Sequence, residues 1–475
     1  MSTETTYHIS RHLRSCNNII DDKELSIFKK FSEPGLSFWG TITGLGLDRT
    51  IEGTFNNKVY VSCLVRTWMT AIVQYLPYCS NNKLVLVVSP YIKEKHVKML
   101  KQADIGNLPV PFSEQVNKIQ RFYDFLTLIR SFLNNNYPEL SNSQVTTTIK
   151  QRLDKILTES TEIEIRFPKI NVNEEKTFIL KYTNKRLNLI TPIDKRFNPY
   201  STIIPRVNNF YLMKGGASVF NFGQKQADYM KNNMVMFIKQ KQRKIKVNDV
   251  VFNNTELSIN SVDTMKKGLF FKTQPQINVY TDYFEKEGMF LFMDWVKNSI
   301  KDVNVDIYVV AHSNIMQATL VNICQLLKNN PLIDKKTLDA CHPAFSVIKH
   351  QNIWEMVLKT ESSMNGLMRL KSMVVREGED PPNDESTNAI DLNQELSCFS
   401  KEIRMDNEPI PIKNNYFGKT VSSSVNNITK RLIPSKTFFS RSEVPPIRSY
   451  ANGGGKKKKT KRRTQRNKNT RKRRS

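Results

Sequence analysis

Residues 307–314 read IYVVAHSN, and residues 7–12 read YHISRH. In each stretch a short apolar run ends in a histidine. Short β-branched runs of this kind are typical of strands inside a sheet. In an open parallel sheet, ligands bind just outside the carboxyl ends of the strands. His12 and His312 are therefore the first candidates for a functional site.

Strands and helices alternate around these stretches, which predicts an α/β fold with a mostly parallel sheet covered by helices. The expected strands are 7–12, 59–62, 84–91, 162–167, 177–182, 306–311 and 353–358. The expected helices are 14–31, 64–76, 113–133, 144–157, 283–300 and 315–327. The glycines of residues 35–48 indicate turns in that segment.

The composition excludes several classes of protein. The 475 residues are 39% hydrophobic, and no apolar run approaches the ~20 residues that a membrane span needs. The N-terminus lacks the basic and apolar regions of a secretory signal. The six cysteines include no CxxC pair, so neither a disulfide framework nor a zinc site is expected. These features indicate a reduced, intracellular protein without a membrane partner.

About half of the formal charge of +28 lies at the C-terminus. Residues 456–475 hold 13 Lys and Arg and no acid, and they follow a hinge of three glycines. Like charges without apolar partners do not form a core, so we expect a disordered tail. Such a tail is suited to non-specific binding of nucleic acid or another polyanion, or to nuclear import. A solubilising role is the simpler alternative.

The rhythm of strands and helices sets the expected domain boundaries. Strands and helices alternate in residues 1–107 and 281–361, which are expected to form the core. They do not alternate regularly in residues 108–280. Residues 362–452 contain acids and prolines and are expected to be a linker, followed by the basic tail at 453–475.

A third segment, residues 62–71 (SCLVRTWMTA), is also a strand end that leads into a helix, and it carries Arg66. The three segments together resemble the motifs of the histidine phosphatase superfamily, also called the phosphoglycerate mutase-like family. The family's first motif is Arg-His-Gly with a Ser and an Asn at fixed offsets. It is matched by Arg11, His12, Ser15 and Asn18.

The family's second motif, Ser-x-Leu-x-Arg-Ala-x-x-Thr-Ala, is matched by Ser62, Leu64, Arg66, Thr70 and Ala71. Its last motif is a strand that ends in histidine, which His312 matches. Residues 36–40 (LSFWG) resemble the Leu-Thr-x-x-Gly stretch between the first two motifs. The resemblance covers less than half of the chain.

The resemblance implies a three-layer α/β/α sandwich and a phosphomonoester hydrolase that needs no metal or other cofactor. His12 would be the nucleophile, and His312 would complete its pocket. Arg11, Arg66 and Asn18 would bind the phosphoryl group of a small-molecule or protein substrate.

The general acid in this branch of the family is usually a Glu after the third strand. Glu94 lies in that place, and Asp104 and Glu114 are alternatives. Ser313 follows the second histidine, where the acid-phosphatase branch has its catalytic Asp, which argues against that branch. Leu13 replaces the usual Gly of the first motif, where it would either crowd the phosphate or only change the local backbone.

These residue types suit phosphoryl transfer on physical grounds. Two Arg forks can hold the phosphoryl oxygens through bidentate, charge-assisted hydrogen bonds. A neutral imidazole, with an unperturbed pKa of ~6.5, is a good nucleophile near pH 7 and forms a phosphohistidine. A second, protonated histidine stabilises the developing charge, and a carboxylic acid protonates the leaving oxygen.

The interval between Glu94 and His312 is far longer than in compact family members, which predicts an inserted cap over residues 108–280. Two other functions stay open. One is a catalytically weak, phosphatase-like protein that binds nucleic acid or a virion through its basic tail, and the other is a mutase. The tail also resembles tails of large-DNA-virus proteins, which would place the chain in the host cytoplasm, the virion or the nucleus.

Overall fold

The computed structural model describes residues 4–15, 33–47, 51, 55–94, 107, 109–136, 144–168, 175–194, 197, 199, 246–257, 288–297, 305–328, 331, 333, 335, 354–362 and 368–377. The chain divides into two compact units, Met1–Pro409 and Ile410–Ser475. All described residues belong to the first unit. The basic tail and most of the expected linker therefore lie outside the described residues.

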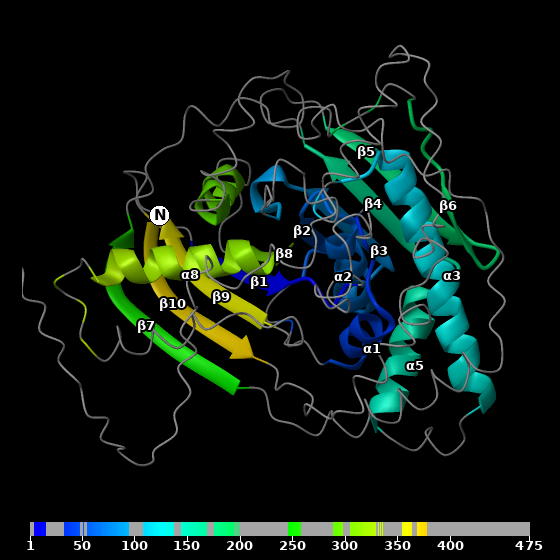
Figure 1. The fold of residues 1–475 in the computed structure, drawn as a ribbon, viewed down its shortest axis with the longest axis horizontal. Helices are drawn as coiled ribbons and strands as arrows, with labels where there is room; N and C mark the ends of the chain where they lie inside the picture. Colours follow the sequence, from blue (N-terminus) through cyan, green and yellow to red (C-terminus); the bar gives the residue numbers. More distant parts are fainter. Residues whose placement is uncertain are drawn as a thin grey trace, which may run out of the picture. The chain divides into compact units, whose positions relative to one another are not determined.

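A single sheet of ten strands organises the described residues (Figure 1). Its centre is parallel and is formed, in spatial order, by β4 (Glu162–Phe167), β3 (Lys83–Val88), β2 (Lys58–Val61), β8 (Val305–Ala311) and β1 (Glu4–Arg11). This centre contains all the strand ends that the sequence motifs follow.

Antiparallel strands extend the sheet on both sides. Beyond β4 lie β5 (Lys176–Thr183) and β6 (Arg186–Leu189), and beyond β1 lie β9 (Trp354–Ser362), β10 (Met368–Glu377) and β7 (Lys246–Leu257). A two-residue turn joins β5 to β6, with Asn184 and Lys185 both at positive φ. Such turns connect antiparallel neighbours, whereas parallel neighbours need a crossover. The sheet as a whole is therefore mixed.

Successive residues of a strand point to opposite faces of the sheet, and apolar side chains lie on both faces. Helices therefore pack against both faces. In β3, Leu86 lies in one hydrophobic core and Val87 in the other. The first core also holds residues of α1 (Phe38–Gly46), α2 (Val65–Tyr75), α3 (Phe112–Asn136) and α5 (Gln144–Ile156). The second also holds residues of the helical segment 288–297 and of α8 (Ser313–Lys328). The α/β class is confirmed.

The structure confirms all seven expected strands to within a few residues, as β1, β2, β3, β4, β5, β8 and β9. It also confirms the helices expected at 64–76, 113–133, 144–157 and 315–327, and residues 288–297 are helical within the expected 283–300.

The helix expected at 14–31 is wrong at its start. Arg14 and Ser15 continue the extended chain, since Ser15 forms an isolated bridge with Leu36 and the Arg14 carbonyl accepts the Ser37 N–H. Residues 16–31 lie outside the described residues.

Two segments expected to lack regular structure contain it. Residues 35–48 hold α1, which begins where the Ser37 hydroxyl accepts a hydrogen bond from the Gly40 N–H. The glycines there serve close packing rather than turns. β10 lies within the expected linker and pairs with β9 and β7, so regular structure continues to Glu377.

The first part of the expected cap belongs to the sheet and to the helices that cover it. β4 pairs in parallel with β3, and α3 and α5 contribute buried residues such as Ile119 and Leu153 to the first core. The described residues from 112 to 189 therefore extend the core, and residues 201–245 lie outside the described residues.

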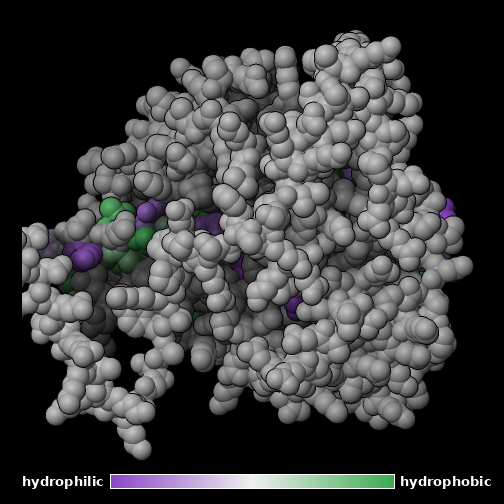
Figure 2. All heavy atoms as spheres, in the orientation of Figure 1, coloured by the Kyte–Doolittle hydropathy of each residue, from purple (hydrophilic) through white to green (hydrophobic). Residues whose placement is uncertain are grey.

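The described surface carries scattered rather than gathered apolar side chains. Its exposed large hydrophobic residues are Ile190, just after β6, Val251 in β7 and Leu326 in α8. Figure 2 shows hydrophobic and hydrophilic atoms intermixed where α8 lies in Figure 1. No helix within the described residues is both long and apolar enough to cross a membrane.

One of the described cysteines differs from the expectation of a chain without disulfides. Cys63 and Cys79 are buried and free. Cys324, on α8, is disulfide-bonded.

Gly40 lets α1 approach the chain that leaves β1. A Cβ atom at Gly40 would overlap the carbonyl oxygen of Arg14, whereas one at Gly44 would meet the side chains of Leu13 and Val73. The Arg14 carbonyl also accepts hydrogen bonds from the Ser37 N–H, at 3.0 Å, and hydroxyl, at 3.1 Å. The N-terminus of α1 therefore holds the segment just after His12.

We expect Gly40→Ala to destabilise the protein by about 1–3 kcal/mol, because the backbone cannot yield to the new methyl group. Helix propensity alone predicts the opposite sign, a gain of roughly 1 kcal/mol. Gly44→Ala is the matched control and should cost less, since the side chain of Leu13 can turn aside. Urea unfolding measures both. A Gly40→Ala variant as stable as the wild type would contradict the close approach.

Candidate active site

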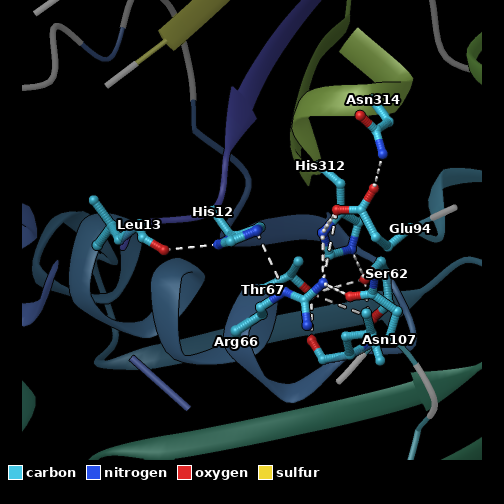
Figure 3. Close-up of polar contacts among 10 residues, drawn as sticks. His12, Leu13, Ser62, Arg66, Thr67, Glu94, Asn107, His312 and Asn314 are labelled. Atoms are coloured by element: carbon cyan, nitrogen blue, oxygen red, sulfur yellow. Dashed lines mark hydrogen bonds and ion pairs between the residues drawn. The ribbon is translucent and has the colours of Figure 1, made fainter. Parts of the chain in front are cut away.

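The carboxyl ends of β3, β2, β8 and β1 lie next to one another and deliver the candidate residues to one place (Figure 3). The His12 N–H donates to the Ala311 carbonyl at 2.9 Å, and so His12 and His312 leave neighbouring strands at the same level. Their imidazole centroids are 5.0 Å apart. The structure thus brings together the two histidines that the sequence singles out.

The ring of His12 has a defined tautomer. Its Nδ1 lies 2.7 Å from the Leu13 carbonyl oxygen, which only accepts, so Nδ1 carries the proton. Its Nε2 then has a lone pair, which accepts a hydrogen bond from Arg66 Nε at 3.3 Å. The Nε2 lone pair of His12 therefore points at the guanidinium group of Arg66 (Figure 3).

Burial keeps His12 neutral. It lowers the pKa of His12 well below 6.5, and the positive charge of Arg66, the neighbouring His312 and the charge of Arg11 lower it further. The hydrogen bond to Leu13 acts in the opposite direction. At pH 7 the imidazole is thus neutral, with its proton on Nδ1 and a lone pair on Nε2.

Leu13, which stands where the motif described above has Gly, does not crowd the polar side chains of the site. Its side chain is buried in the first hydrophobic core, against the α1 side. Its N–H donates to the Thr70 hydroxyl at 3.0 Å, and that hydroxyl donates to the Arg66 carbonyl at 2.8 Å. Thr70 therefore links the backbone beside His12 to the turn of α2 that carries Arg66.

Arg66 is buried in the first turn of α2 and joins most of the site. Its Nη2 donates to Asn107 Oδ1 at 2.7 Å and lies 3.4 Å from His312 Nδ1. The same nitrogen is 3.7 Å from Glu94 Oε2. Sequence reasoning missed Asn107, which lies outside the motifs and is brought in by the segment that leads to α3.

His312 is fully buried between a hydroxyl and a carboxylate. Its Nε2 is 2.7 Å from the Ser62 hydroxyl, and its Nδ1 is 3.2 Å from Glu94 Oε2. Burial lowers the pKa of His312 to about 4, although the charge of Glu94 raises it. In the site without substrate, burial and the nearby arginines therefore disfavour the imidazolium ion of His312, and the protonated second histidine of the expected mechanism stays a prediction for the bound state.

Glu94 is the carboxylate that reaches this centre. It is 7% exposed, and its Oε1 accepts a hydrogen bond from Asn314 Nδ2 at 2.9 Å. Its other oxygen faces His312 and Arg66. Asn314 was missed as a site residue, although it lies only two positions after His312.

The remaining candidates have different outcomes. Arg11, the last residue of β1, is buried, and burial lowers its pKa to about 10, so it stays charged at pH 7. Asn18 and Asp104 lie outside the described residues. Glu114 lies in the first turn of α3.

The site contains one set of groups that is also found around metals. Ligand atoms of His12, Glu94 and His312 lie within 4.8 Å of one another. However, Arg11 and Arg66 place two positive charges beside the carboxylate of Glu94, and Arg66 already donates to His12 Nε2. The charge of the pocket therefore favours an anion over a divalent cation.

Comparisons of the chain with protein-family models, with curated proteins and with solved structures found no match. The interpretation of the site therefore depends on its residues and their geometry.

We expect both histidines to stay neutral well below the usual imidazole range. In histidine-labelled protein, nitrogen NMR should show His12 with its proton on Nδ1, and His312 should titrate near pH 4. An unperturbed imidazole titrates near pH ~6.5. His12→Asn and His312→Asn variants assign the two signals. Titration of His12 at or above pH ~6.5 would contradict the buried, cation-flanked environment.

Proposed function

We propose that this chain is a phosphomonoester hydrolase of the histidine phosphatase type, which acts through a phosphohistidine on His12 without a metal ion. The observation that carries the proposal is the orientation of His12. Its Nδ1–H is held by the Leu13 carbonyl, so its Nε2 lone pair points into a pocket with Arg66. A neutral nucleophile beside fixed positive charges is suited to attack on a phosphoryl dianion.

Substrate binding would exchange one set of hydrogen bonds for another. Arg66 donates to His12 and Asn107 in the structure, and phosphoryl oxygens would replace these acceptors. Arg11 adds a second guanidinium at the end of β1. Charge-assisted bonds to a dianion are stronger than those to a neutral imidazole or amide, so the exchange is favourable.

In the first chemical step, His12 Nε2 attacks phosphorus while the bond from phosphorus to the leaving oxygen breaks. Glu94, in its protonated form, donates its proton to that oxygen. Asn314 holds Glu94 Oε1, which leaves Oε2 toward the centre of the site. General acid catalysis of this kind contributes ~10²–10⁴ in rate.

In the second step, water attacks phosphorus and the bond from phosphorus to nitrogen breaks. The Glu94 carboxylate takes the proton from the water, and inorganic phosphate leaves. His312 is neutral in the free site, but a phosphoryl dianion beside it favours the imidazolium ion. Proton uptake by His312 on substrate binding would then balance charge in the transition state.

The finer architecture belongs to the same proposal. We take the two helical layers around the sheet as the α/β/α sandwich of this family. The rest of the region expected to form a cap, residues 201–245 and 258–280, lies outside the described residues. The competing function, binding of nucleic acid through residues 456–475, depends on composition alone.

The first experiment compares wild type and His12→Ala in hydrolysis of 4-nitrophenyl phosphate with a chelator present. We expect hydrolysis and an acid-labile, alkali-stable phosphoenzyme in the wild type, and neither in His12→Ala. His8→Asn is the matched control, because His8 is another buried histidine, lies within β1 and is near Asp306 rather than in the site. It should retain hydrolysis per folded molecule.

Equal rates in wild type and His12→Ala would remove His12 as the nucleophile. No hydrolysis and no binding of inorganic phosphate in the wild type would overturn the proposal and favour the nucleic-acid-binding alternative. Transfer of the phosphoryl group to a second hydroxyl of the product, rather than to water, would identify a mutase.

A second prediction concerns the general acid. Glu94→Gln should lower kcat/KM for an alkyl phosphate by ~10²–10⁴, because a poor leaving group needs a proton. The loss for 4-nitrophenyl phosphate should be much smaller, because nitrophenolate leaves without protonation. Steady-state kinetics with both substrates measure the difference. Equal losses would show that Glu94 acts through charge or structure rather than as an acid.

A further inference from the structure

A second buried carboxylate, Glu33, lies outside the catalytic set described above. It is fully buried and precedes α1 by a few residues. Its Oε1 accepts hydrogen bonds from the Val65 N–H and from Gln115 Nε2, both at 2.6 Å. Its Oε2 accepts one from the Val110 N–H. One carboxylate thus receives donors from α2, from α3 and from the segment between Asn107 and α3.

These donors belong to the segments that hold Arg66. Val65 is the first residue of α2 and directly precedes Arg66. Val110 follows Asn107, whose side chain binds Arg66 Nη2. Gln115 also donates to the Cys63 carbonyl at 2.8 Å, beside Ser62.

The contact with Val65 replaces a missing cap. The N-cap residue of α2 is Leu64, which has no side chain able to accept a hydrogen bond. A helix N-terminus exposes unpaired N–H groups and favours a negative charge. Glu33 supplies both acceptor and charge from a distant part of the chain.

The backbone at Glu33 is strained to allow this. Its φ angle is 45°, in the left-handed region that non-glycine residues rarely adopt. Burial raises the pKa of Glu33 to about 7, although the N–H groups of Val110 and Val65 lower it, as do Lys118 and Gln115. Strain and burial at one residue are costly, and they persist where the surrounding contacts require them.

We infer that Glu33 is a positioning residue for Arg66. By joining the start of α2 to the Asn107 segment and to α3, it fixes the direction in which the guanidinium group faces the phosphoryl oxygens. This inference rests on the proposed function, because it concerns how that function's phosphate clamp is held.

The test uses Glu33→Gln, which keeps the size of the side chain but turns one accepting oxygen into a donor. With 4-nitrophenyl phosphate as substrate, we expect kcat/KM to fall roughly 10- to 100-fold, as small misplacements of a positioned group do. We also expect the inhibition constant of inorganic phosphate to rise. A merely structural role would lower the folded fraction and leave that constant unchanged.

A double-mutant cycle with Arg66→Lys decides whether Glu33 acts through Arg66. If it does, Glu33→Gln should change the phosphate inhibition constant less than about twofold in the Arg66→Lys background, because the effects of coupled residues are not additive. Fully additive effects would overturn the inference.

Two further variants keep the test sharp. Gln115→Met removes one donor to Glu33 and should weaken phosphate binding less than Glu33→Gln does, so it serves if Glu33→Gln does not fold. Gln74→Met is the matched control on α2, since neither polar side-chain atom of the buried Gln74 has a hydrogen-bond partner among the described residues. It should leave the inhibition constant unchanged.

The outcomes separate this inference from the proposed function. A wild type that neither hydrolyses the ester nor binds inorganic phosphate overturns both. The inference alone is overturned if the wild type hydrolyses the ester and binds inorganic phosphate, and the Arg66→Lys variant loses both properties. In that case Glu33→Gln and Gln115→Met would retain both.

Discussion

The site depends on the parallel pairing of β1 with β8. These strands are separated by most of the described chain, yet they pair in register from Thr5 and Val305 to Arg11 and Ala311. The pairing continues one step further, through the His12 N–H and the Ala311 carbonyl. Because a slip by one residue would turn each side chain to the other face, this register alone decides that His12 and His312 meet.

Around that pair, burial and charge set the protonation states. Two buried guanidinium groups repel a proton from either imidazole, and burial acts in the same direction. A single carboxylate, that of Glu94, opposes them at His312. The pocket therefore keeps its histidines neutral while it keeps a positive field, a combination that water would not sustain because solvent screens such charges.

The sequence predicted the residues at the centre of the site better than the residues that hold them in position. His12, Arg66, Glu94 and His312 follow strand ends, and parallel strand ends meet at one edge of a sheet. Asn107 and Glu33 carry no such signal, because single polar residues in irregular segments acquire partners only through tertiary packing. The same limit explains α1, whose glycines indicate turns locally but fit a close helix contact, and β10, whose pairing with β9 and β7 is non-local.

The polar contacts of Arg66 show how its guanidinium group is held among the described residues of the site. Its contacts in the site include the imidazole nitrogen of His12 at 3.3 Å, the amide oxygen of Asn107, and the Glu94 carboxylate at 3.7 Å, which also faces His312. These partners hold the guanidinium group in place beside His12 and Glu94. Under the proposed function, phosphoryl oxygens would replace acceptors around a guanidinium group that is already positioned, which is the condition for electrostatic stabilisation to lower a barrier.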